Sequence, residues 1–161
     1  MTPETLLYRQ VNPNWVQNGG VSNLAFVASS TVHVTSSVFT PTKKDENKLS
    51  VYNGDEFSPR QSFEHFTKQY NSCGVLGVTV GEFEAEDLKC DADNKPFAGH
   101  VSVDYSICKS RGEMERKAKK MRDKAMNRGW LYQVGQEESV EQEMQKEDAV
   151  NDSIPVDNQA T

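Results

Sequence analysis

The chain has 161 residues, of which 35% are hydrophobic and 26% are charged, and its formal net charge is −6 at pH 7. The negative charge is concentrated after residue 136, where eight acidic residues accompany one lysine, so the first 136 residues carry 17 basic and 16 acidic side chains. A nearly neutral body of this size excludes a general electrostatic attraction to nucleic acid or membranes, and it is large enough to bury a core without disulfides or metal.

The three cysteines, Cys73, Cys90 and Cys108, are widely spaced and include no Cys-x-x-Cys pair. This spacing is typical of free thiols in a reducing cytosol rather than of a disulfide framework. The first ten residues lack a basic segment followed by an apolar one, and no apolar run approaches membrane length. We therefore expect a cytoplasmic protein with no membrane association.

The first half of the chain predicts several short strands separated by turns and one charged loop. The loop covers residues 41–48, which contain charges and no apolar residue. The predicted strands cover residues 6–11, 21–28, 31–39 and 49–52.

The first helix has a clear N-terminal signal. Ser58, Pro59 and Gln61 have the spacing of a capping box with proline at the first helical position, and we expect the helix to end near Asn71. Aromatic residues at helical spacing then predict a face that packs on the sheet. These residues are Phe63, Phe66 and Tyr70.

Two strands and a second helix are predicted after residue 73. Residues 74–83 form the densest apolar run and predict a central buried strand, followed by a loop of little order over residues 85–96. Residues 99–107 alternate between apolar and polar side chains, as a half-buried strand does. A capping box at Ser110 begins the second helix, and Gly129 caps its end. Its apolar stripe consists of Met114, Ala118, Met121 and Ala125.

The order of these elements predicts one α+β domain over residues 1–135. We expect a mixed or antiparallel sheet of about five to six strands with two helices packed on one side. Residues 136–161 are predicted to form an acidic, largely disordered tail.

The second helix carries a dense positive charge. Such a surface suits a phosphate backbone or an acidic partner protein, and a solvated amphipathic helix is the plainer alternative. The acidic tail is long enough to fold back onto this helix and mask it. The residues that we expect to bind the partner are Lys117, Lys119, Lys120, Arg122, Lys124 and Arg128.

His100, Ser102 and Asp104 share the polar face of one predicted strand. A histidine near a carboxylate can do acid–base chemistry. Alternate residues of one strand are about 7 Å apart, so contact between a nucleophile and a base requires groups from elsewhere in the chain. A polar, solvent-facing strand surface is the alternative. No metal site is expected, because Cys90, His100 and Cys108 lack closely spaced ligand pairs.

A further pattern consists of Arg9 in the first strand, Thr35-Ser36-Ser37 in a later strand and Glu82-Phe83-Glu84 after the central run. This order resembles the Arg, Ser-Thr-Ser, Glu-x-Glu layout of ADP-ribosyltransferases. The resemblance implies that Arg9 contacts the phosphates of NAD and that Ser36 shapes the nicotinamide pocket. It further implies that Glu84 stabilises the oxocarbenium-like ribose, with Glu82 as the first acid of the pair.

No phosphate-binding loop, dinucleotide fingerprint, nucleophile elbow or zinc-protease motif occurs in the sequence. The leading hypothesis is a small non-catalytic interaction or regulatory protein that needs no cofactor and binds a protein or nucleic acid through its basic helix and acidic tail. The alternative is an ADP-ribosyltransferase-like enzyme that uses NAD. The enzyme requires Arg9, Ser36 and an acid of the Glu-x-Glu pair to converge on a pocket, whereas the interaction protein requires only an exposed basic face.

Overall fold

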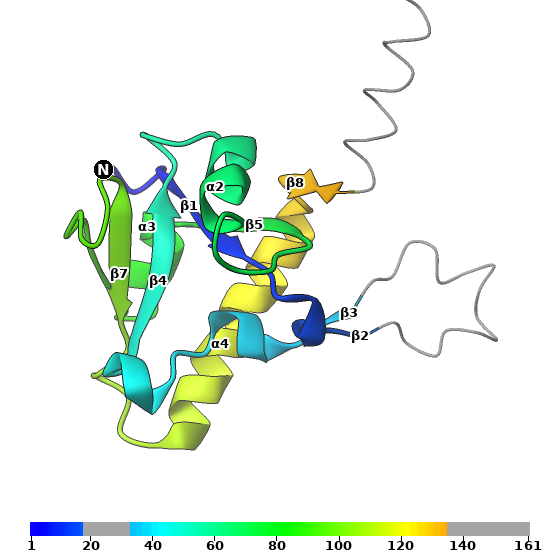
Figure 1. The fold of residues 1–161 in the computed structure, drawn as a ribbon. Helices are drawn as coiled ribbons and strands as arrows, with labels where there is room; N and C mark the ends of the chain where they lie inside the picture. The colour runs from blue at the N-terminus through cyan, green and yellow to red at the C-terminus, as the bar shows by residue number, and fades with distance from the viewer. Residues whose placement is uncertain (18–32, 135–161) are drawn as a thin grey trace, which may run out of the picture.

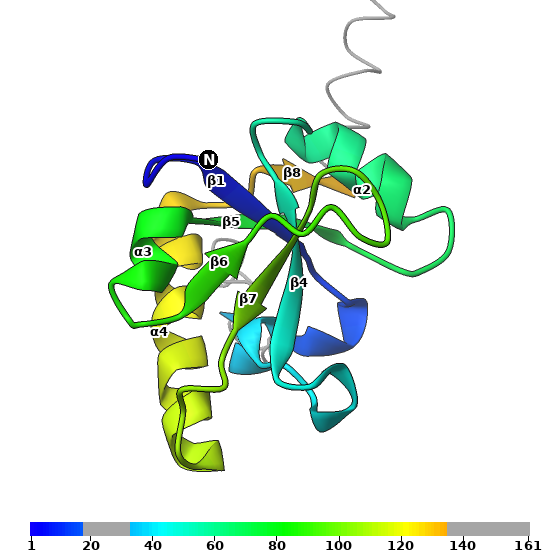
Figure 2. The same cartoon turned by 90° about the vertical axis from the view of Figure 1, so that its left-hand side faces the viewer.

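The structure is a computed structural model and describes residues 1–17 and 33–134. A curled sheet forms its centre, and every neighbouring pair of strands in it is antiparallel. Its strands are β1 (Leu6–Gln10), β4 (Lys48–Asn53), β5 (Gly74–Thr79), β6 (Lys89–Asp91), β7 (His100–Asp104) and β8 (Tyr132–Gln133). In space they follow the order β6-β7-β4-β1-β5-β8, which confirms an α+β fold with an antiparallel sheet (Figures 1 and 2).

The two faces of this sheet bury two separate groups of apolar side chains. One face presents Leu7 and Val78 to the main core, which includes the apolar stripe of α4 (Arg111–Arg128). The other face presents Tyr8 and Val75, which pack with aromatic residues of α2 (Pro59–Phe66). Successive residues of a strand point to opposite faces, so Leu7 and Tyr8 belong to different clusters. The two helices therefore lie on opposite faces of the sheet, and the predicted packing of both on one side is not confirmed (Figure 2).

The start of α2 follows the sequence signal closely. The hydroxyl of Ser58 accepts a hydrogen bond from the backbone N–H of Gln61, whose side chain accepts one from the backbone N–H of Ser58. The helix ends at Phe66 rather than near Asn71. Tyr70 lies beyond this end and is 61% exposed, so the prediction that it faces the sheet is wrong.

The apolar stripe predicted for the second helix is confirmed. Met114, Ala118, Met121 and Ala125 are all buried on α4. At the C-terminal end Gly129 adopts φ +95°, and its N–H donates to the carbonyl of Ala125. Glycine takes this positive φ without the steric cost of a Cβ atom, which explains why the helix ends there.

The predicted strand over residues 74–83 is wrong in its second half. β5 ends at Thr79, and a short helix, α3 (Val80–Glu84), follows. Thr79 and Glu82 form a reciprocal capping box, so the apolar residues after Thr79 continue as a helix rather than as a strand. The loop predicted over residues 85–96 also contains β6, which pairs with β7.

The predicted strand over residues 31–39 is shorter in the structure. Its described part is β3 (His33–Val34), which pairs with β2 (Val16–Gln17) in a separate two-stranded sheet. A 3-10 helix, η3 (Ser36–Phe39), follows and buries two consecutive residues, which alternation along a strand does not allow. Two further 3-10 helices are η1 (Pro13–Trp15) and η4 (Lys43–Asp45).

The predicted strand over residues 21–28 and the predicted tail over residues 136–161 lie outside the described residues. Residues 130–132 return the chain to the sheet as expected, where β8 pairs with β5. In the part of the chain that the structure describes, no helix is both long enough and apolar enough to cross a membrane.

Candidate functional site

The side chain of Arg9 occupies the place where β1 and β4 cease to pair. The register between these strands runs through Leu7 and Tyr8. At Arg9 the guanidinium replaces backbone pairing, because Nη1 donates to the carbonyl of Ser50 at 3.0 Å and Nε donates to the carbonyl of Val38 at 2.7 Å. Burial lowers the pKa of Arg9 to about 10, which leaves it charged at neutral pH.

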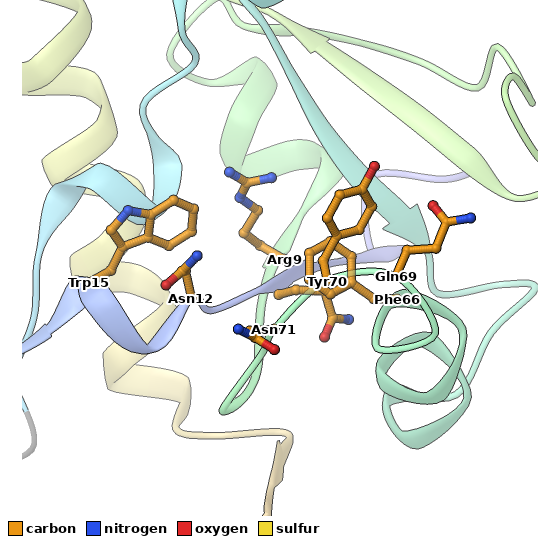
Figure 3. A pocket seen from close by; sticks show the side chains of 8 residues that line it. Arg9, Asn12, Trp15, Phe66, Gln69, Tyr70 and Asn71 are labelled. Atoms are coloured by element: carbon orange, nitrogen blue, oxygen red, sulfur yellow. The ribbon is translucent and has the colours of Figure 1, made fainter.

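A groove lies beside Arg9 and consists of two neighbouring cavities of about 390 and 530 Å³. The two cavities share five lining residues and together form one site, called the Arg9 groove. These shared residues are Arg9, Gln10, Phe66, Gln69 and Tyr70. Figure 3 shows the side chains that line the smaller cavity. The smaller cavity continues toward Trp15, and the larger one continues toward Ser50 and His100.

Ser50, His100 and Asp93 form a chain of hydrogen bonds at the wall of the larger cavity. The Oγ atom of Ser50 lies 3.0 Å from Nε2 of His100, and Nδ1 of His100 lies 2.6 Å from Oδ1 of Asp93. The carboxylate at Nδ1 holds the imidazole proton there, which leaves the lone pair on Nε2 to accept the hydroxyl proton of Ser50. This is the arrangement by which a base activates a serine nucleophile.

The strands place these three side chains by pairing segments that are distant in sequence. Ser50 lies on β4, and its polar face continues across the sheet to His100 on β7. The turn that follows β6 carries Asp93 back over β7, where the backbone N–H of Asn94 donates to the carbonyl of His100. The imidazole is therefore nearly buried, with 8% of its side chain exposed, while Ser50 remains accessible from the groove.

Asp93 is held in its charged form. Its partial burial opposes ionisation, but hydrogen bonds from His100, from Ser102 and from the backbone of Lys95 outweigh this cost and lower the pKa of Asp93 below its ordinary value. The contact with Ser102 is a 2.7 Å hydrogen bond from its hydroxyl to Oδ2. Asp93 is thus oriented from two sides and can fix the position of the imidazole.

An aromatic wall closes one side of the larger cavity. The ring of Phe97 lies 4.5 Å from that of His65, 5.0 Å from that of Tyr52 and 5.3 Å from that of His100, measured between ring centroids. The hydroxyl of Tyr52 also lies 2.9 Å from Nδ1 of His65. The wall shields the imidazole of His100 from water on this side.

The sequence identified His100 but paired it with a different carboxylate. Asp104 accepts a hydrogen bond from the backbone N–H of Ser106, and Asp93 is the acid that contacts His100. Ser50 and Asp93 were not among the predicted site residues. Ser50 alternates with apolar neighbours in the predicted strand over residues 49–52, but no local signal links it to His100.

The structure does not gather the four residues of the ADP-ribosyltransferase-like pattern around one cavity. Arg9 lines the groove near the end of β1, whereas Glu82 and Glu84 belong to α3, beyond the start of β1. Glu82 completes the cap of α3 and forms a 3.0 Å ion pair with Arg128. Ser36 lies in η3, where its carbonyl accepts a hydrogen bond from the Thr40 hydroxyl.

Four of the six predicted partner-binding residues on α4 contact other parts of the fold. Lys117 is buried and donates to the carbonyl of Glu86, and Lys120 forms an ion pair with the side chain of Glu86 at 3.3 Å. The Arg122 and Arg128 side chains donate to the carbonyls of residues 34 and 77. Lys119, Lys120, Lys124 and Arg128 are exposed, whereas Arg122 is half-buried. The exposed basic surface is therefore smaller than the sequence suggested.

Lys117→Met is expected to lower the free energy of unfolding by about 1–2 kcal/mol, because the carbonyl of Glu86 loses its donor. Lys119→Met is the matched control, and its exposed position predicts a change within about 0.5 kcal/mol. Urea denaturation followed by circular dichroism measures both values. Equal stability of the two variants would show that Lys117 is not a structural residue.

Comparison with protein-family models, curated proteins and solved structures gives no match. Among the described residues, no group of three or more histidine, cysteine or acidic side chains is arranged to hold a metal ion. The three cysteines are unpaired thiols. The most developed chemical arrangement in the described part of the chain is the one that joins Ser50, His100 and Asp93.

Proposed function

We propose that this protein is a serine hydrolase that cleaves an ester through an acyl-enzyme intermediate on Ser50. The observation that carries the proposal is the continuous hydrogen-bond chain from Ser50 through His100 to Asp93 at the wall of the Arg9 groove. Nucleophile, base and orienting acid each have the contact that their role requires. The fold itself contributes no argument, because folds and activities are only loosely linked.

The reaction begins when Nε2 of His100 takes the proton of the Ser50 hydroxyl as Oγ attacks the carbonyl carbon of the ester. The tetrahedral intermediate collapses, the bond from carbon to the alcohol oxygen breaks, and His100 returns the proton to the departing alcohol. Water then enters and gives a proton to His100 while its oxygen attacks the acyl carbon. The acid leaves as Ser50 recovers its proton.

The negative charge of Asp93 lies beside Nδ1 of His100 and assists both the acylation and the deacylation of Ser50. It stabilises the imidazolium that forms each time His100 holds the extra proton, and it keeps Nδ1 protonated so that Nε2 faces Ser50. Ser102 acts as a positioning residue, because its hydroxyl holds the second oxygen of Asp93.

A fluorophosphonate probe tests the proposal directly, since an activated serine displaces its fluoride and forms a stable phosphonate ester. We expect one adduct per chain, located on Ser50 by peptide mass spectrometry. Ser50→Ala should abolish the adduct, whereas Ser37→Ala, which removes an exposed hydroxyl elsewhere, should leave it unchanged. A chain that stays unlabelled, or that is labelled at another residue, would show that these hydrogen bonds serve only to satisfy buried polar groups.

A second candidate function is the interaction or regulatory protein inferred from the sequence. It is favoured by the exposed Lys119 and Lys124 on α4. Binding to nucleic acid should then weaken with salt and be lost when both lysines are changed to glutamate. Use of NAD by the transferase alternative remains a prediction, measured by thermal stabilisation of the protein at millimolar NAD.

A further inference from the structure

The Arg9 groove has an unbalanced charge. Among the described residues that line its two cavities, the cationic side chains are Arg9 and Lys68, and none is acidic. The acid nearest to the reaction centre, Asp93, contacts His100 but is not part of the lining. A groove with this lining attracts anions and disfavours cations.

Arg9 is rigidly held but lacks a carboxylate partner within ion-pair distance among the described residues. Its Nε and Nη1 atoms donate to two neutral backbone carbonyls, and its guanidinium lies 5.3 Å from the centre of the Trp15 ring. Figure 3 shows the side chain between Trp15 and Tyr70. The Arg9 side chain is half-buried, and the charge of Asp45 acts on it only from beyond ion-pair distance. Its Nη2 atom forms no hydrogen bond to the described residues, so an anion that reaches this edge gains a strong one.

The cation and the nucleophile are adjacent. Nη1 of Arg9 donates to the backbone carbonyl of Ser50 itself, and both residues line the larger cavity. A substrate whose carboxylate binds Arg9 can therefore place its ester carbonyl at the Ser50 hydroxyl when only a few atoms of the substrate separate these two groups. Lys68, which lines the same cavity, adds a second positive charge.

We propose that the substrate is a half-ester of a short dicarboxylic acid, whose free carboxylate binds Arg9 and Lys68 while its ester carbonyl meets Ser50. This inference rests on the proposed function, because the ester is cleaved by the serine and histidine described above. It adds the substrate class, namely acyl groups that carry a negative charge.

The first experiment compares two esters of matched length, the mono-4-nitrophenyl ester of glutaric acid and 4-nitrophenyl valerate. We expect kcat/KM to be at least about tenfold higher for the anionic ester. Lys68→Gln should reduce this preference about threefold, as expected for an exposed cation. Lys119→Gln is the control, because it removes an exposed cation on α4, outside the lining, and should change the rate on neither ester. Equal rates on the two esters, or a preference for valerate, would overturn the inference.

The second experiment separates this inference from the proposed function. Calorimetric titration of the Ser50→Ala variant with glutarate and with neutral glutaramide measures binding without chemistry. Glutarate should bind at least about tenfold more tightly than glutaramide, and Arg9→Gln should remove the difference. Thermal melting confirms that the Arg9 variant is folded.

The outcomes of the two experiments are distinct. If the fluorophosphonate fails to label Ser50 but glutarate still binds in an Arg9-dependent manner, the hydrolase proposal fails and the carboxylate site stands. If Ser50 is labelled and valerate is cleaved as fast as the anionic ester, the hydrolase stands and the substrate class is wrong.

Discussion

Ser50→Ala is expected to lower kcat for hydrolysis of the glutarate half-ester by about 10³-fold or more. The hydroxyl oxygen is the atom that forms the acyl-enzyme, and its 3.0 Å contact with Nε2 of His100 is the route by which its proton leaves. Stopped-flow absorbance of released 4-nitrophenol measures the effect, and the wild-type protein should show a burst that the variant lacks. Ser50 is an exposed residue, so the variant should melt at nearly the wild-type temperature.

The three residues should act as one unit. His100→Ala is expected to cost about as much as Ser50→Ala, and the double variant should be little worse than either alone, because each loss removes the same step. Asp93→Asn, which keeps the shape of the side chain but alters the tautomer it supports, should also lower kcat strongly. Multiplicative losses in the double variant would show that Ser50 and His100 act independently and would contradict the mechanism.

The lowered pKa of Asp93 determines how the free energy of unfolding changes with pH in the acidic range. Because hydrogen bonds lower this pKa in the folded state, the charge of Asp93 contributes stability at pH values above the unfolded pKa of aspartate. That contribution is lost as the pH falls through the lower folded value. Asp93→Asn should therefore flatten the dependence of unfolding free energy on pH in the acidic range.

Gly54→Ala is expected to lower the free energy of unfolding by about 2–3 kcal/mol. The N–H of Gly54 donates to the carbonyl of Leu6 at 2.8 Å, and a Cβ atom added at Gly54 would overlap this same carbonyl oxygen. The clash is with backbone, so a side-chain rotation cannot relieve it. The added methyl group would also press on the ring of Tyr8 at 3.2 Å, on the face of the sheet that supports α2.

Gly112→Ala is the control for this substitution. Gly112 lies in the first turn of α4, where an added Cβ meets its nearest neighbour, the hydroxyl of Ser110, at an ordinary 3.9 Å. Alanine favours the helix over glycine, so this variant should be more stable by up to about 1 kcal/mol. Chemical denaturation measures both changes. A stable Gly54→Ala protein would show that β1 and β4 approach less closely than described.

Several elements were predictable because their signals are local. The capping box at Ser58 begins α2, and the stripe from Met114 to Ala125 predicted the buried face of α4. Alternation predicted β7 in the same way, although the strand ends at Asp104 rather than at residue 107, and Ile107 is exposed. These signals depend on residues within one or two turns or on one strand, where spacing alone determines which side chains share a face.

Competing local signals explain the main errors. Thr79-Val80-Gly81-Glu82 carries a capping box, but the apolar run around it favoured a longer strand. The assignment of both helices to one face was also beyond local patterns. The face that a helix covers depends on which strand side chains it contacts. Leu7 packs with residues of α4 and Tyr8 packs with residues of α2, although the two are neighbours in sequence.

The sequence by itself determined the α+β class, the starts of both long helices and the polar strand face that contains His100. Only the tertiary structure decided that Ser50 and Asp93 flank His100, since Ser50 is 50 positions away along the chain and meets it through the pairing of β4 with β7. It also decided that four of the six basic residues of α4 that were predicted to bind a partner contact other parts of the fold. Contacts of this kind depend on strand register. A shift of β4 against β7 by two residues would keep the same apolar face buried, so alternation alone does not select the pairing that brings Ser50 to His100.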